Sequence, residues 1–324
     1  MNEDRLRRSP NVGIVGSTSL LGRELKELLE DGGFPLGRLI PFETEEYAGL
    51  LQEFAGDLQI TQIISPGSLE DVDIAFFTCG PEIMSSYVRS GAPFPELTID
   101  LTQSGRPGQL FLSGLSDTAS LGPRGYFVNP HPTAIVMARV LSRLHNVFGV
   151  RTASATVLQS ASERANAGVD ELQEQTVNLL NFQTVECKVF GGQLAFNMLR
   201  SEDPIGSQFT RLMGRTFPQP MMTTLQAPVF HSHCFSIFVE LLHPPEADAV
   251  RDALAADSSF VVHAPDDEPS PIGVVGKHGI HIGRIQEAGD RIALWAVADN
   301  LRIAASNAIR TAENIMLTAI GDRL

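Results

Sequence analysis

Short apolar runs alternate with amphipathic stretches along the first part of the chain. The first run, at 12–15, breaks into a Gly/Ser/Thr turn, and leucines then recur at helical spacing. Ser17 or Thr18 is placed to cap that helix, and Gly32 and Gly33 are placed to end it. The pattern predicts a buried strand, a tight turn and a helix in direct succession.

Further apolar runs follow at 36–42, 72–80 and 97–102, separated by helical or polar segments. Such alternation up to about residue 128 is typical of a Rossmann-type doubly wound parallel sheet. Ligands of these sheets lie at the carboxyl ends of the strands. The loops to watch are therefore 43–49, 78–82 and 102–107.

The second half has a different pattern. Runs at 152–158, 235–242 and 291–299 predict strands of a mixed sheet, with helices such as 168–182 covering one side of it. We therefore expect an α/β protein with two domains. One is a dinucleotide-binding domain of residues 1–128 plus 300–324, and the other is a dimerisation or substrate domain of residues 129–299.

The last helical stretch carries a stripe of mostly small side chains, and we expect it to be buried against the first domain. The stripe consists of Leu301, Ala305, Ala308, Ala312 and Ile315.

The composition argues against several classes of partner. The formal net charge of −14 over 324 residues argues against nucleic acid, which selects for Lys and Arg. The charged N-terminus is no secretory signal, and no apolar run is long enough to span a membrane. The three cysteines lie far apart, which disfavours disulfides and structural zinc. The cytoplasm is the expected compartment.

The glycine turn after the first strand has candidate chemistry. Gly16 and Gly22 occupy the outer positions of G-x-x-G-x-x-G, while Ser19 replaces the central glycine. A strand, turn and helix of this kind suits a dinucleotide pyrophosphate, although a tight turn without a ligand gives the same pattern. The candidate cofactor-binding residues are Gly16, Thr18, Ser19, Leu20, Gly22, Glu46, Thr78, Gly80 and Asn300.

The loop after the second strand is acidic. It contains Glu43, Glu45 and Glu46 and no basic residue. A carboxylate there accepts from the 2′-hydroxyl of an adenosine ribose, whereas a 2′-phosphate requires a base such as arginine. The loop favours NAD over NADP, unless it is only a solvated acidic loop and no nucleotide is bound.

These stretches, in their order and spacing, resemble the aspartate-semialdehyde dehydrogenase family. The matching segments are VGIVGSTSLLGREL, DVDIAFFTCG, VNPHPTAIV, VLQSAS with AGVDELQEQT, QLAFNML, APVFHSHCFSI and ADNLRIAASNAIRTAE. The resemblance implies NADP-dependent reductive dephosphorylation of aspartyl phosphate through a cysteine thioester, assisted by a histidine and substrate-binding arginines. It also implies a homodimer formed through the second domain's sheet.

The framework of the family is retained better than its chemistry. The family's nucleophile turn reads Asn-Pro-Asn-Cys-Ser/Thr, and here Pro132 occupies the cysteine position. Proline has no side-chain heteroatom, so no acyl-enzyme forms there. It is instead a favourable first residue for the helix that follows. His233 and Gln159 match the family's catalytic histidine and glutamine.

Other positions depart from the family. Gln226 stands where the resemblance implies a substrate-binding arginine, and Glu46 lies where the cofactor arginine is expected. A flexible Gly-Ala-Gly segment has become 163–165, of sequence Glu-Arg-Ala. The phosphate-binding helix is shortened, with only Arg211 and Arg215 nearby.

His233 is either a working base or a hydrogen-bonded core histidine. His131 either polarises a carbonyl from the start of the following helix or only caps it. His231 and His233 would share a strand face, but Cys234 points to the other, so no metal site is expected. Cys79 and Cys234 fit buried hydrophobes better than nucleophiles.

The sequence thus predicts a pseudoenzyme with a binding or regulatory role, dimeric, with a small-molecule ligand in the cleft between its domains. One alternative is an NAD(P)-dependent semialdehyde oxidoreductase that works without the cysteine, using His233 or His131 as acid. Another is a scaffold that binds no nucleotide.

Overall fold

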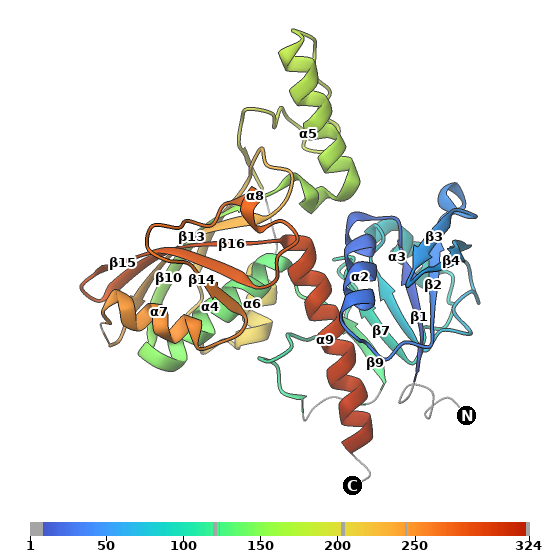
Figure 1. Ribbon diagram of the computed structural model, residues 1–324, viewed down its shortest axis with the longest axis horizontal. Helices are drawn as coiled ribbons and strands as arrows, with labels where there is room; N and C mark the ends of the chain where they lie inside the picture. The colour runs from blue at the N-terminus through green and yellow to red at the C-terminus, as the bar shows by residue number, and fades with distance from the viewer. Residues whose placement is uncertain (1–8, 119–121, 123, 202–204, 244, 322–324) are drawn as a thin grey trace. The chain divides into compact units, whose positions relative to one another are not determined.

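A computed structural model gives the fold and describes residues 9–118, 122, 124–201, 205–243 and 245–321 (Figure 1). The chain divides into two compact units, Met1–His131 with Ala304–Leu324 and Pro132–Ile303.

The first unit is built on a parallel sheet of seven strands, in the order β5-β2-β1-β6-β7-β9-β8. Its strands are β1 (Asn11–Val15), β2 (Arg38–Glu43), β5 (Gln62–Ile63), β6 (Ile74–Phe77), β7 (Leu97–Asp100), β8 (Gln109–Leu110) and β9 (Gly125–Val128). A separate hairpin pairs β3 (Leu51–Phe54) with β4 (Asp57–Ile60). The predicted doubly wound parallel sheet is confirmed.

Helices cover both faces of this sheet because its strands are apolar on both sides. On one face Val12 and Ile14 pack with α2 (Leu20–Asp31) and α9 (Asn300–Gly321). On the other, Val15 and Phe77 pack with α3 (Pro81–Arg89). The buried part of the α9 stripe is Ala305, Ala308, Ala312 and Ile315, which lies in the first core as expected.

The second unit is built on a mixed sheet in the order β11-β12-β10-β13-β16-β15-β14. Its strands are β10 (Val150–Gln159), β11 (Leu199–Arg200), β12 (Met221–Gln226), β13 (His233–Leu241), β14 (Phe260–Val262), β15 (Ile280–Ala288) and β16 (Arg291–Ala298). The helices that begin in this unit are α4 (Pro132–Phe148), α5 (Ala165–Leu180), α6 (Ile205–Met213), α7 (Ala247–Ala255), α8 (Pro271–Val274) and α9. The predicted mixed sheet is confirmed.

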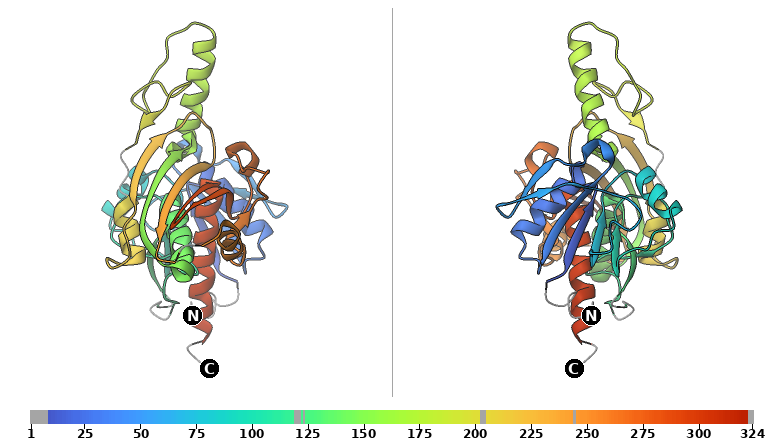
Figure 2. Two further views of the ribbon diagram at one scale, coloured as in Figure 1. Left: turned by 90° about the vertical axis from the view of Figure 1, so that its left-hand side faces the viewer. Right: turned by 90° about the vertical axis from the view of Figure 1, so that its right-hand side faces the viewer.

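The prediction that α5 covers this sheet is wrong. The helix projects beyond the sheet (Figures 1 and 2), and its Leu172 packs against Ala161, Leu194 and Ala195. The buried carboxylate of Glu171 accepts the N–H groups of Val189 and Phe190, at 2.6 and 3.2 Å. Its contacts are therefore with the segment that returns along it.

No helix within the described parts of the chain combines the length and apolarity that a membrane crossing needs.

Candidate functional site

The glycine turn in the first unit is packed too tightly for side chains. Gly16 has a φ of +91°, and a Cβ on it would lie 2.5 Å from the backbone nitrogen of Cys79. A Cβ on Gly22 would lie 2.2 Å from the carbonyl oxygen of Gly16. Both glycines are therefore required for the turn to seat against α2 and against the end of β6.

Ser19, and neither Ser17 nor Thr18, caps α2. The Ser19 hydroxyl accepts the N–H of Gly22 at 2.9 Å and donates to the Thr78 carbonyl at 3.1 Å. The predicted caps are wrong because α2 begins at Leu20, so Ser19 is the residue that directly precedes the helix. The second partner of Ser19, the Thr78 carbonyl, lies 59 residues away on the segment after β6. The Thr78 hydroxyl lies 3.0 Å from the Gly16 carbonyl, to which it donates. Ser19 and Thr78 thus fasten the turn to the neighbouring strand end.

Glu43, the last residue of β2, lies against the same turn. It is only 5% exposed, and its Oε1 accepts the backbone N–H of Thr18 at 2.6 Å and the Thr18 hydroxyl at 2.7 Å. Glu46 is exposed on the short 3₁₀ turn Glu45–Tyr47. The carboxylate at the β2 end, where Rossmann folds read the adenosine ribose, is therefore Glu43.

The other predicted residues of this group are found at element ends. Leu20 is the first residue of α2, and Gly80 is the residue that precedes α3.

An aspartate at the end of β7 forms a neighbouring cluster that the sequence analysis did not name. Asp100 accepts from the Tyr126 hydroxyl at 2.5 Å and from the Thr102 N–H at 2.8 Å. The Arg106 guanidinium lies 4.7 and 4.8 Å from the ring centres of Phe94 and Tyr126. Burial and the bond to Asp100 raise the pKa of Tyr126. The sequence signal that could have identified this cluster is an aspartate at the end of an apolar run.

Pro132 is the first residue of α4, which confirms the predicted helix after the Asn129-Pro130 strand end. The α4 stripe of Ile135, Ala138, Leu141 and Leu144 is fully buried. His131, just before the helix, is buried as well. The helix therefore begins with a residue that lacks both an N–H and a reactive side chain.

His233 is the centre of a buried polar group in the second unit. It is 1% exposed, and its Nδ1 accepts the backbone N–H of Ser160 at 3.2 Å. Its Nε2 lies 2.9 Å from Oε2 of Glu163. Because an amide N–H can only donate, the proton of the neutral ring lies on Nε2 and is directed at the Glu163 carboxylate.

Asn300 belongs to this group in the second unit. Its Oδ1 accepts from the Ser160 and Ser162 hydroxyls at 3.2 and 3.1 Å and from the Ser232 N–H at 3.2 Å. The sequence predicts Asn300 as a cofactor residue, and it does not predict the serines. Their small polar side chains give no periodic signal, and only the fold brings them to one asparagine.

Gln159 and Gln226 are opposite each other at the ends of β10 and β12. Both are buried, and the Gln226 side-chain amide donates to the Gln159 backbone carbonyl at 3.0 Å. Gln226 therefore ties two strand ends together. Arg211 and Arg215 are exposed, on α6 and just after it.

The metal alternative rested on a shared strand face, and that placement is wrong. β13 starts at His233, and Ser232 before it has a φ of +70°, so His231 is not part of the strand. Within the described residues no cluster of His, Cys, Asp or Glu is arranged to hold a metal ion.

Cys79 and Cys234 are buried, as predicted. Burial raises the pKa of both thiols, that of Cys234 to about 12.

Two family models match this chain, one in each half. Residues 11–127 match the NAD binding domain of semialdehyde dehydrogenases, and residues 141–303 match their dimerisation domain. The chain is thus built from the two domains of the semialdehyde dehydrogenases, an NAD(P)-binding domain of Rossmann type and a dimerisation domain. The chain belongs to the aspartate-semialdehyde dehydrogenase family.

Relatives extend along almost the whole chain. Aspartate-semialdehyde dehydrogenase 2 of Vibrio cholerae is 29% identical, over 94% of this chain and 96% of its own length. A USG-1 protein homolog of Pseudomonas aeruginosa is 28% identical over the same shares of the two chains. The solved structure of a probable aspartate-semialdehyde dehydrogenase from Pseudomonas aeruginosa has a TM-score of 0.85 and 27% identity, covering 96% of this chain and 99% of its own.

Proposed function

We propose that this protein binds a nicotinamide dinucleotide but does not form the thioester of its dehydrogenase relatives, and therefore acts as a binding or regulatory protein. The observation that carries this proposal is Pro132 as the first residue of α4. The family resemblance puts the nucleophilic cysteine at that position, and proline offers no atom to which an acyl group can be attached.

The three thiols of the chain do not replace that cysteine. Cys79 packs against the glycine turn, and Cys234 lies inside the second unit, both with raised pKa values. A nucleophilic cysteine needs an accessible thiolate. Cys187 lies beside α5, where the Gln175 amide contacts its sulfur at 3.6 Å.

His233 is held in a way that suits a structural role. In the family resemblance it is the acid/base residue, and Glu163 comes from the segment that corresponds to Gly-Ala-Gly. The contact of 2.9 Å between Glu163 Oε2 and His233 Nε2 occupies the ring nitrogen that carries the proton. The alternative oxidoreductase, with His233 as acid, would need Glu163 to move away.

The first unit fits a dinucleotide without a 2′-phosphate. The turn has the strand, glycine and helix order that suits a pyrophosphate, and Glu43 at the β2 end suits ribose hydroxyls. A 2′-phosphate beside this buried carboxylate would be repelled. The proposed dinucleotide is therefore NAD, and when bound it would supply only recognition, without hydride transfer to a thioester.

The remaining predictions stay part of the proposal. The functional domains are residues 1–128 with 300–324 and residues 129–299, and the protein binds a small-molecule ligand. His233 and Gln159 retain family positions without the family's reaction. The homodimer forms through the mixed sheet, whose Met221 and Phe238 are exposed.

Two measurements on the purified protein test this function. Calorimetric titration is expected to show NAD binding at least about tenfold tighter than NADP binding. Aspartate semialdehyde, phosphate and either nucleotide are expected to give no reduced nucleotide. Phosphate-dependent reduction by protein free of host enzyme would refute the loss of the reaction, and absence of nucleotide binding would leave the scaffold alternative.

A double variant tests how deeply the chemistry is lost. Pro132→Cys with Gln226→Arg returns the two family residues, yet activity is expected to stay near background because Glu163 still engages His233. Substantial activity in this variant would show that Pro132 and Gln226 alone separate the protein from its enzymatic relatives.

A further inference from the structure

The hairpin β3–β4 of the first unit exposes apolar side chains on its outward face. Leu51 is paired with Ile60 and Glu53 with Leu58, so these four side chains share one face. On that face Leu51, Leu58 and Ile60 are 63%, 67% and 62% exposed. A hairpin with one buried face normally places polar residues on the other. Here the outward face is mainly apolar.

The opposite face of the hairpin is fixed to the body of the unit. Phe54 is buried in the core beside α2. The Gln52 side-chain amide donates to the Ser17 hydroxyl at 2.8 Å and to the Thr61 hydroxyl at 3.0 Å. The exposure of Leu51, Leu58 and Ile60 therefore follows from the strand register, since turning them inward would expel Phe54.

Local geometry makes the hairpin rigid. Ala55 and Gly56 have φ values of 50° and 84°, the two left-handed residues that a tight hairpin turn needs. The Ala55 N–H donates to Glu30 of α2 at 2.8 Å. The apolar face is thus preorganised, which lowers the entropic cost of binding a partner. The hairpin extends outward from the sheet of its unit (Figure 2).

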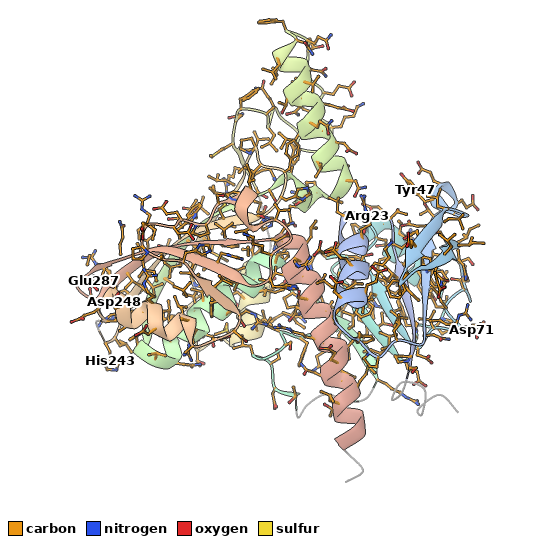
Figure 3. All side chains as sticks on the ribbon, in the orientation of Figure 1. Arg23, Tyr47, Asp71, His243, Asp248 and Glu287 are labelled. Atoms are coloured by element: carbon orange, nitrogen blue, oxygen red, sulfur yellow. The ribbon has the colours of Figure 1, made fainter. Side chains whose placement is uncertain are left out.

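Further exposed apolar residues lie next to the hairpin in sequence. Tyr47 lies beside the hairpin (Figure 3), and Leu50 and Ile63 flank it in sequence; all three are exposed. Single exposed apolar residues are ordinary, whereas a contiguous group on one rigid element marks an interaction surface. We call the hairpin surface the set Leu51, Leu58 and Ile60.

Charge determines which partner this surface suits. The hairpin and the 3₁₀ turn that precedes it carry four exposed carboxylates, Glu45, Glu46, Glu53 and Asp57, and residues 39–88 contain no lysine, arginine or histidine. Among the described residues, no cation lies within ion-pair distance of Glu45, Glu46, Glu53 or Asp57. This field repels nucleic acid, anionic lipid and a second copy of the same surface.

We propose that the hairpin surface binds another protein through a segment that presents apolar side chains flanked by lysine or arginine. Apolar contacts with Leu51, Leu58 and Ile60 supply the buried centre of the interface. The carboxylates around them select the cationic flanks and speed association. This docking is independent of nucleotide binding, so either property can fail without the other.

Site-specific photo-crosslinking in the native host cells tests this proposal on the full-length protein. A benzophenone amino acid replaces Leu58, and the same residue at Phe182, which is 100% exposed on the second unit, is the control. A discrete adduct is expected from position 58 alone. Mass spectrometry of the joined peptides is expected to locate a partner segment with alternating apolar and basic residues.

The mapped segment, made as a labelled peptide, then gives the quantitative test with purified protein. Its affinity is expected to fall at least tenfold in Glu53→Lys/Asp57→Lys and in Leu51→Ser/Ile60→Ser, and to fall as salt rises. These side chains are exposed, and circular dichroism checks that each variant folds; Leu58→Lys serves as a third variant. The proposal is overturned by no adduct at position 58, by an adduct to a second copy or to lipid, by a segment without basic residues, or by affinities that the charge reversals leave unchanged.

Discussion

Two carboxylates in the two units show how one residue type has opposite consequences. Glu43 accepts two hydrogen bonds from Thr18, both on Oε1, and among the described residues none ends on its Oε2. Glu163 is directed at the protonated nitrogen of a histidine. The first carboxylate leaves an acceptor at the position where Rossmann folds read a ribose. The second occupies a group that the family resemblance assigns to acid/base chemistry.

This difference separates the two parts of the proposed function, nucleotide binding in the first unit and the lost reaction in the second. The glycine turn is maintained by packing that allows no Cβ at Gly16 or Gly22. The His233 group is maintained by hydrogen bonds among Ser160, Ser162 and Asn300, which satisfy one another inside the unit. The glycine turn suits a ligand. In the His233 group, the polar side chains form hydrogen bonds with one another.

The largest expected effect is on the reactivity of two buried thiols, Cys79 in the first unit and Cys234 in the second. Burial raises the pKa of Cys234 from 9.0 to about 12, so at pH 8 its thiolate fraction is about 10³-fold lower in the folded chain than in the unfolded one. Cys79 is shifted in the same direction. We expect Ellman's reagent to modify only Cys187 rapidly in native protein, and all three cysteines in urea.

Cys187→Ser is the control for this labelling, and it should leave the native protein almost unreactive. Rapid native modification of Cys79 or Cys234 would mean that a thiol is available for nucleophilic chemistry, which would contradict the proposed loss of the reaction.

The next largest effect is on stability in the first unit. Gly22→Ala places a Cβ against the Gly16 carbonyl, and we expect it to lower the free energy of unfolding by about 3 kcal/mol. Gly206→Ala in α6 is the matched control, because its Cβ would meet no atom within 4 Å. That change is expected to be neutral or to stabilise by up to about 1 kcal/mol. Urea denaturation followed by circular dichroism measures both, and equal effects would contradict the close packing.

The sequence predicted the elements whose burial repeats at a fixed period. Val12, Ile14 and Phe76 lie in buried parallel strands, so they form apolar runs that are readable without the fold. The alanines of α9 gave the same kind of signal. Pattern failed for α5, because Glu171 and Gln175 are buried polar residues that bind backbone groups of the returning segment.

The candidate site was less readable because its contacts join distant residues. Glu163 and His233 are 70 positions apart, and Ser160 and Asn300 are 140 apart. The sequence identified His233 through a resemblance and could not show its partner. The sequence also favoured Glu46 as the carboxylate that reads the ribose. The glutamate that contacts the glycine turn is set by the residue at which β2 ends, and the sequence does not show where that is.

A moderate effect is expected from removing the carboxylate in the second unit. Glu163→Ala removes the carboxylate that faces the buried Nε2 of His233, and we expect a loss of about 1 to 3 kcal/mol in the free energy of unfolding. Glu163→Gln keeps an acceptor oxygen and is expected to lose less. Nitrogen NMR of labelled histidine should show the Nε2–H tautomer in the native protein and a shifted Nε2 signal in Glu163→Ala. An unchanged spectrum would mean that the pair does not hold the ring.

The smallest expected effect is on nucleotide affinity, and it tests the role of Glu43 directly. Glu43→Gln keeps the size of the side chain and removes its charge, so we expect NAD affinity to fall by up to about tenfold. NADP affinity should rise or stay constant, since the repulsion of a 2′-phosphate disappears. Glu46→Gln, exposed on the same loop, is the matched control and should change neither affinity. Calorimetric titration of both nucleotides measures this, and a larger loss of NAD affinity in Glu46→Gln than in Glu43→Gln would return the ribose-reading role to the residue favoured by the sequence pattern.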